Sequence, residues 1–279
     1  MNNIFEQMLS KYEIRTKADE LNALHEVMQE ITLAALYRSG FFENAAFYGG
    51  TCLRIFHKLP RFSEDLDFSL FQKNDTFSLN TYFSAIETEF MAYGRQVELV
   101  KKEKKVYSSV DSAFHKDNTE VYNIQFKTEK TVKIKIEVDK DPPPNFNTEY
   151  KLLLLPFSFM VRCFDIPSLF AGKMHAILFR EWKGKVKGRD WYDLEWYVRH
   201  NHLLDFERLK TRSMQKGFSG TTEFTKEIFI ELLKEKIRKT DIKQVIADVR
   251  PFVKNINELS IWSPDYFLQL VNLIQFKEN

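Results

Sequence analysis

The feature that most constrains the fold is the block Tyr48–Phe68, which reads YGGTCLRIFHKLPRFSEDLDF. It follows a short apolar segment, Ala45–Tyr48, that is typical of a buried strand. Two glycines and Thr51 then lead into a helix-like segment. Glycine lets a ligand approach the backbone, and a helix N-terminus presents free N–H groups to an anion. Gly49, Gly50 and Thr51 are therefore candidate phosphate-binding residues, although a plain strand-to-helix turn would use the same residues.

The same block ends in two aspartates on a strand predicted at residues 62–71. Strand alternation places Asp65 and Asp67 on one face, with Leu66 on the other. Two carboxylates about 6–7 Å apart on one face repel each other, and a divalent cation between them relieves that repulsion. Mg²⁺ prefers one or two carboxylates together with substrate phosphates. The pair is thus a candidate site for Mg²⁺ or Mn²⁺, with a solvated strand edge as the alternative.

A phosphate-type turn followed by Asp-x-Asp on the next strand resembles the nucleotidyltransferase superfamily that includes DNA polymerase beta. That resemblance implies a third carboxylate from a neighbouring strand. The strand predicted from Val132 carries two candidates on one face, which is also the face of Lys133 and Lys135. Glu137 is the first choice for the third metal ligand and Asp139 the second. A salt-bridged strand face is the alternative interpretation of Glu137.

The rest of the chain predicts an α+β fold, with a mixed sheet in the N-terminal part and helices after it. The apolar spacing predicts a helix over residues 17–39, and further strands at 96–101 and 120–127. A triple proline at 142–144 marks a connection, a helix follows over 165–182, and Gly188 opens another. Beyond Asn201 only helical patterns are visible. We expect a nucleotidyltransferase domain over residues 1–200, where an internal edge could fall near 142–165, and a helical bundle domain over 201–279.

Two blocks together resemble a specific family. Tyr48–Phe68 is similar to the GGTxLR…RxSxDLDF signature of the AbiEii/AbiGii (DUF1814-type) toxins, and Leu169–Leu194 is similar to their downstream motifs. These are nucleotidyltransferase-like toxins of bacterial toxin–antitoxin and phage-defence systems. The resemblance implies a polymerase-beta-like core. It also implies that Arg61 and Ser63 belong to the nucleotide site and that Asp190, the first aspartate of the RDxxDL motif, belongs to the active site.

Lys173 lies in the second block, on a predicted helix. An ammonium near a triphosphate would neutralise charge on the phosphates, and a snorkelling surface lysine is the alternative. The basic loop Lys183–Lys187 could contact the phosphates of a nucleic acid, or be a solvated loop. Aromatic residues flank this loop, and we expect most of them to pack in the core, with base stacking open to one or two.

These observations predict a metal-dependent nucleotidyltransferase that transfers NMP from an NTP to an acceptor hydroxyl. The family resemblance implies a toxin, an RNA acceptor such as the acceptor end of tRNA, and a separately encoded antitoxin; a protein hydroxyl is a further acceptor. One alternative is a nucleotidyltransferase of the antibiotic-modifying type that acts on a small molecule. Another is a nucleotide-binding interaction module without transfer activity.

Composition narrows the remaining classes. Lys+Arg 41 against Asp+Glu 39 excludes a generally basic nucleic-acid coat, though not a local basic groove. Two cysteines without a CxxC pair disfavour a zinc ribbon or a disulfide framework. The N-terminal segment lacks the apolar region of a signal peptide, and no apolar run approaches the ~18 residues of a membrane-spanning helix. We therefore expect a cytoplasmic protein with no membrane partner.

Overall fold

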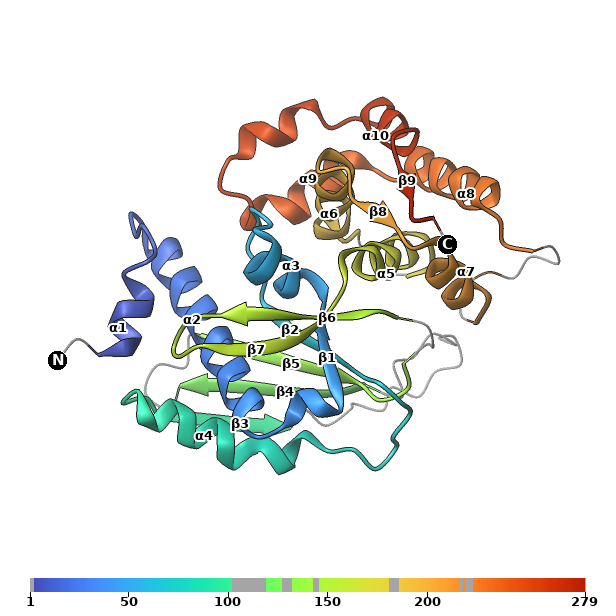
Figure 1. Cartoon of the computed structure of the whole chain (residues 1–279). Coiled ribbons are helices and arrows are strands. Elements are labelled where there is room, and N and C mark those ends of the chain that lie inside the picture. Colours follow the sequence, from blue (N-terminus) through green and yellow to red (C-terminus); the bar gives the residue numbers. More distant parts are fainter. Residues whose placement is uncertain are drawn as a thin grey trace, which may run out of the picture. The chain divides into compact units, whose positions relative to one another are not determined.

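Figure 1 shows the computed structural model of the chain. It describes residues 3–101, 119–126, 132–142, 146–180, 186–215, 218 and 223–278. The chain divides into two compact units, and neither of them is continuous in sequence. Unit 1 comprises Met1–Cys52, Glu64–Pro142 and Thr148–Cys163, and unit 2 comprises Leu53–Ser63, Pro143–Asn147 and Phe164–Asn279.

A mixed seven-stranded sheet forms the centre of unit 1, and it has the strand order β3-β4-β5-β2-β1-β7-β6. The strands are β1 Ala45–Tyr48, β2 Asp65–Leu70, β3 Val97–Lys101, β4 Thr119–Phe126, β5 Lys133–Asp139, β6 Thr148–Leu153 and β7 Phe159–Phe164. Strand β2 runs parallel to β5 and antiparallel to β1, and β1 runs parallel to β7. This sheet, together with the many helices, confirms the predicted α+β class with a mixed sheet.

The helical elements of unit 1 are α1 Ile4–Leu9, α2 Lys17–Arg38, η1 Phe41–Glu43, α3 Gly49–His57, η2 Leu79–Tyr82 and α4 Phe83–Ala92; the end of α3 lies in unit 2. Thr16 and Asp19 form a capping box at the start of α2, and Gly40 follows it in the left-handed conformation. Helix α2 packs against α4 and contacts β5. Its buried apolar residues therefore cover the sheet next to the strands that carry the predicted carboxylates.

Most predicted elements of unit 1 are present, with two differences. Strand β2 begins at Asp65 rather than at residue 62, so Ser63 precedes the strand. The paired strands β6 and β7 were not predicted, and for β6 the reason is that it is an edge strand with apolar residues on its exposed side. Tyr150 and Leu152 are 59% and 55% exposed, which removes the alternation of apolar and polar residues that identifies a half-buried strand.

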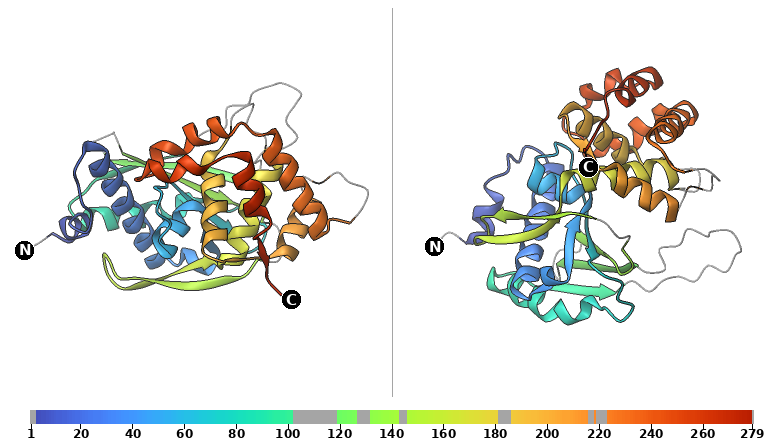
Figure 2. Two further views of the ribbon diagram at one scale, coloured as in Figure 1. Left: turned by 90° about the horizontal axis from the view of Figure 1, so that it is seen from above. Right: turned by 45° about the vertical axis from the view of Figure 1, so that its right-hand side comes forward.

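Unit 2 is mainly helical. Its helices are α5 Ile166–Phe179, α6 Gly188–Arg199, α7 Phe206–Gln215, α8 Lys226–Lys239, α9 Ile242–Val249 and α10 Pro264–Val271, with 3₁₀ turns η3 Arg250–Phe252 and η4 Ile256–Ile261. Helix α5 packs against α6 and α7, α6 packs against α9, and α8 packs against α10 (Figures 1 and 2). Asp165 caps α5 by accepting a hydrogen bond from the Ser168 N–H, as its Asp-Ile-Pro-Ser sequence indicates.

The prediction of helices alone beyond Asn201 was wrong in one respect. Strands β8 Leu203–Leu204 and β9 Gln275–Phe276 pair in parallel as a small second sheet. Two-residue strands are too short to show any alternation in sequence. Helices α5 and α6 belong to unit 2, so the compact units do not divide at residue 200. Compactness and independent folding are different properties, and the domain boundary at residue 200 stays a prediction.

Candidate active site

The turn between β1 and α3 lies against the carboxylate of Asp67. Gly49 has a φ of +85°, and a Cβ built on it would lie 2.4 Å from Asp67 Oδ2. Glycine is therefore required here both by the backbone conformation and by the space that Asp67 occupies. Thr51 is fully buried, and its hydroxyl donates a hydrogen bond to the backbone carbonyl of Asp65. The turn that was predicted to bind phosphate is thus in direct contact, within unit 1, with the strand that was predicted to bind metal.

Asp65 and Asp67 lie on one face of β2, as predicted, whereas Leu66 and Phe68 on the other face are fully buried. The parallel pairing of β2 with β5 sets Asp65 opposite Lys135 and Asp67 opposite Glu137. Because side chains alternate along both strands, these four residues share the same face of the sheet.

The strand register distinguishes the two candidates for the third carboxylate. Glu137 is paired with Asp67, whereas Asp139 is paired with Ser69 one step further along. Asp139 Oδ1 also accepts a hydrogen bond of 3.1 Å from the backbone N–H of Asp141. The register therefore favours Glu137, whose role as a metal ligand stays a prediction.

Lys135 is a residue of this site that the sequence analysis named only as part of the strand face. Its ammonium is ion-paired with Glu137 and lies 3.9 Å from Asp65 Oδ2. Burial disfavours the charged form, but the charges of Glu137, Asp65 and Asp67 outweigh burial and raise the pKa of Lys135. The signal in the sequence was its position two residues before Glu137, which places both on one strand face.

The donor set fits a hard divalent cation. Carboxylate oxygens are the ligands that Mg²⁺ prefers, and Mg²⁺ needs only one or two of them when substrate phosphates complete the coordination. Among the described residues, no three Asp, Glu, His or Cys side chains form a ready metal cluster. Asp65, Asp67 and Glu137 thus provide the right chemistry without a complete protein cage.

The other predicted site residues lie in unit 2, in a buried cluster of four charged side chains. Arg61 donates from Nε and Nη2 to the two carboxylate oxygens of Asp193, both at 2.7 Å. The ammonium of Lys173 lies 2.6 Å from Asp190 Oδ1 and 2.8 Å from Asp193 Oδ2. Two positive and two negative charges are therefore balanced in an environment that is nearly closed to water.

The electrostatics of this cluster depend on its pairing. Burial alone would raise the pKa of Asp190, but the neighbouring charge of Lys173 outweighs burial and lowers it. Burial alone would lower the pKa of Lys173, and the charges of Asp190 and Asp193 raise it instead. Lys173 and Asp190 are consequently both held in their charged forms.

The structure shows what several other predicted site residues contact. Arg61 is 1% exposed, and its guanidinium donates to both carboxylate oxygens of Asp193, so it holds that carboxylate in place. Its predicted nucleotide contact is not tested by this placement, and the same holds for Ser63. Of the basic loop, Lys183 and Lys185 lie outside the described residues, while Lys187 precedes α6 as its N-cap.

Most of the aromatic residues that flank the basic loop are buried in the core, as expected. Trp191 and Tyr197 are 3% and 0% exposed, and Trp182 lies outside the described residues.

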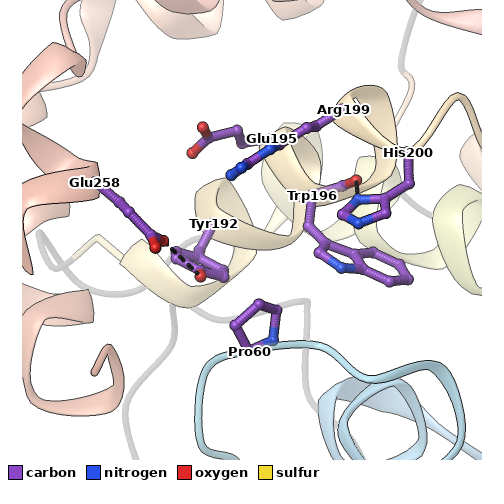
Figure 3. Close-up of a pocket in the computed structure, with 7 residues that line it drawn as sticks. All are labelled: Pro60, Tyr192, Glu195, Trp196, Arg199, His200 and Glu258. Carbon is purple, nitrogen blue, oxygen red and sulfur yellow. Dashed lines mark hydrogen bonds between the residues drawn. The ribbon is translucent and has the colours of Figure 1, made fainter. Parts of the chain in front are cut away.

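A cavity of about 160 Å³ within unit 2 is lined by Pro60, Tyr192, Glu195, Trp196, Arg199, His200 and Glu258 (Figure 3). Glu195 accepts hydrogen bonds of 2.7 Å from Trp262 and Tyr266, so this carboxylate is bound by the protein itself.

Comparison with known families and structures agrees with the arrangement. A model of the family described as "Nucleotidyl transferase AbiEii toxin, Type IV TA system" matches residues 31–270. The chain belongs to the AbiEii family. It is a nucleotidyltransferase toxin of a type IV toxin–antitoxin system, and membership implies an antitoxin partner. The resemblance seen in the sequence is confirmed over most of the chain.

Two solved structures show the same fold. MenT4, a nucleotidyltransferase toxin from Mycobacterium tuberculosis, has a TM-score of 0.61 and 14% identity, with 96% of this chain and 88% of that chain covered. JHP933 from Helicobacter pylori has a TM-score of 0.52 and 17% identity, with 91% of each chain covered. No curated protein matches the AbiEii member described here. In the described part of the chain, no helix is long and apolar enough to cross a membrane.

Proposed function

We propose that the toxin transfers NMP from an NTP to a hydroxyl of RNA, with the acceptor end of tRNA as the target, in a reaction that depends on Mg²⁺ or Mn²⁺. The observation that carries this proposal is the register of β2 and β5, which pairs Asp67 with Glu137 and sets Asp65 on the same face. The glycine turn lies directly against this group through Gly49.

Asp65, Asp67 and Glu137 would hold the cation, which when bound supplies Lewis-acid stabilisation of charge on the reacting phosphate. The backbone N–H groups at the start of α3, at Gly49 and Gly50, would bind the phosphates of the NTP. Thr51 supports them indirectly, because its hydroxyl fixes the backbone of β2 at Asp65.

The reaction is a substitution at the α-phosphorus. The acceptor hydroxyl oxygen forms a new bond to this phosphorus, the bond to the bridging oxygen breaks, and pyrophosphate leaves. The hydroxyl proton passes to solvent. We propose that Lys173 balances negative charge in this reaction and that Asp190 orients its ammonium, since these two groups are in contact at 2.6 Å.

The test is incubation with each NTP, Mg²⁺ and total cellular RNA, using label on the α-phosphate or on the γ-phosphate. Transfer of the α-label alone to RNA is the expected result, because nucleotidyl transfer releases the γ-phosphate in pyrophosphate. Label on a protein or on a small molecule would identify that molecule, in place of RNA, as the acceptor. Absence of any labelled acceptor would contradict transferase activity and favour a nucleotide-binding interaction module.

The matched variants are Asp65→Asn and Asp75→Asn. Asp65 is partly exposed in the proposed site, so the Asp65→Asn variant should fold. It should lose nucleotidyl transfer and toxicity by at least ~10²-fold. Asp75 lies outside the site, and its side chain is 68% exposed. Its variant makes the same chemical change and should keep full activity. Full activity of Asp65→Asn would remove the proposed site.

A further inference from the structure

Lys135 is placed among the proposed metal ligands by the backbone rather than by a flexible approach from elsewhere. It lies two residues before Glu137 on β5, so both side chains are on one face. The parallel register then sets it opposite Asp65. Its ammonium contacts Glu137 and lies 3.9 Å from Asp65 Oδ2, with Asp67 as a third nearby charge.

The ammonium therefore supplies positive charge among the carboxylates that would hold a divalent cation. Carboxylates this close destabilise one another unless a positive charge lies among them. Glu137 is 9% exposed at its side chain, which makes its contact with Lys135 less screened than a surface ion pair. An ammonium and a divalent cation at the same carboxylate oxygen repel each other, so pairing with Lys135 weakens the binding of a metal there.

We propose that Lys135 is an internal counter-ion that competes with the divalent cation for Asp65 and Glu137. This inference rests on the proposed function. In the nucleotide-free toxin, the ammonium stabilises the carboxylates and keeps the affinity for metal low. An NTP brings its own phosphate oxygens, which complete the coordination of the cation and also attract the ammonium away from the carboxylates. Metal and NTP consequently bind together, and either one alone binds weakly.

The experiment compares Mn²⁺ affinity, measured by electron paramagnetic resonance, in the wild type and in Lys135→Met without nucleotide. Removing the ammonium should tighten Mn²⁺ binding by ~10-fold or more, because a competing unit charge is lost. Lys133→Met is the matched control, since Lys133 is exposed on the same strand and face and the variant loses the same charge. It should change Mn²⁺ affinity by less than ~2-fold, because its charge is more distant and screened.

A second measurement uses thermal unfolding in EDTA and in Mg²⁺. Lys135→Met should unfold at a lower temperature than the wild type in EDTA, and Mg²⁺ should raise its midpoint by more than that of the wild type. Equal Mn²⁺ affinities of Lys135→Met and the wild type, or equal midpoints in EDTA, would overturn the inference while leaving the proposed function intact.

The wild type alone provides a test that does not depend on the folding of any variant. Its Mn²⁺ affinity, corrected for the Mn²⁺ that the analogue binds in the absence of protein, should rise by at least ~10-fold when a non-hydrolysable NTP analogue is present, because the phosphates add ligands and displace Lys135. An affinity unaffected by the analogue would overturn the counter-ion role. If Mn²⁺ binds neither the wild type nor Lys135→Met, with or without the analogue, the metal-dependent function itself fails.

Discussion

Arg61 and Asp193, 132 positions apart in the sequence, form a bidentate ion pair with two N–O distances of 2.7 Å. Both side chains are almost completely buried. Asp193 also contacts Lys173, so the pair connects the segment before β2 to the two helices that carry the family's downstream motifs. We therefore expect Arg61 to hold Asp193 in place and, through Asp193, the ammonium of Lys173.

Arg61→Met should lower the free energy of unfolding by about 3–5 kcal/mol, because Asp193 would keep a buried charge with one partner fewer. Urea denaturation measures the change. Arg15→Met is the control, since Arg15 pairs with Glu13 at side chains that are 74% exposed, and its effect should stay within about 0.5 kcal/mol. A similar small effect at Arg61 would show that the pair does not stabilise the fold.

Gly49→Ala should reduce nucleotidyl transfer by ~10²-fold or more, because the new methyl group would displace the carboxylate of Asp67 by about an ångström. Gly94→Ala separates this effect from backbone strain. Gly94 has a similar φ of +72°, but nothing lies within 4 Å of the position of its Cβ. That variant should lose about 1–2 kcal/mol of stability and keep its activity. Equal activity of the two variants would contradict the placement of Asp67.

Gly188→Ala should strongly destabilise unit 2, because a Cβ at this residue would lie 2.1 Å from the backbone oxygen of Val245 on α9. Backbone atoms of a packed helix cannot move away cheaply. Gly172→Ala provides the opposite case within α5, where nothing lies within 4 Å of the added Cβ. It should raise stability by about 0.5–1 kcal/mol, as alanine favours helices. Thermal unfolding of both variants tests the close approach of α6 to α9.

Glu30 on α2 predicts a pH dependence of stability. Burial raises its pKa from 4.5 to about 7, despite Lys11 at 3.8 Å. The folded state binds this proton more tightly than the unfolded state, so stability falls as pH rises from about 4.5 to about 7 and stays lower above that range. Glu30→Gln should remove this slope and raise stability at pH 8 by up to about 3 kcal/mol. Denaturant unfolding at several pH values measures it, with exposed Glu20→Gln as control; parallel wild-type and Glu30→Gln profiles would refute the assignment.

The sequence allowed the local elements and the carboxylate face to be predicted, because both depend on periodicity. Strand β1 was predicted with its observed bounds, and the shared face of Asp65 and Asp67 followed from alternation. The partner of each residue could not be predicted, since the pairing of Asp67 with Glu137 depends on the order and register of strands that are distant in sequence. For the same reason, the ion pair of Arg61 with Asp193 and the location of Lys135 among the acids required the structure.

Because neither unit is continuous in sequence, some contacts of the toxin can form only after much later residues have been synthesised. Residues leave the ribosome in order, so Arg61 must wait for 132 further residues before Asp193 is synthesised. Unit 1 needs only the chain up to Cys163, and its carboxylates are all present by Glu137. A translation product that stops in between carries the acidic face without the partners of Arg61 and Lys173. The buried cluster can therefore form only after Asp193 has left the ribosome, whereas the acidic face of unit 1 needs only the chain up to Cys163.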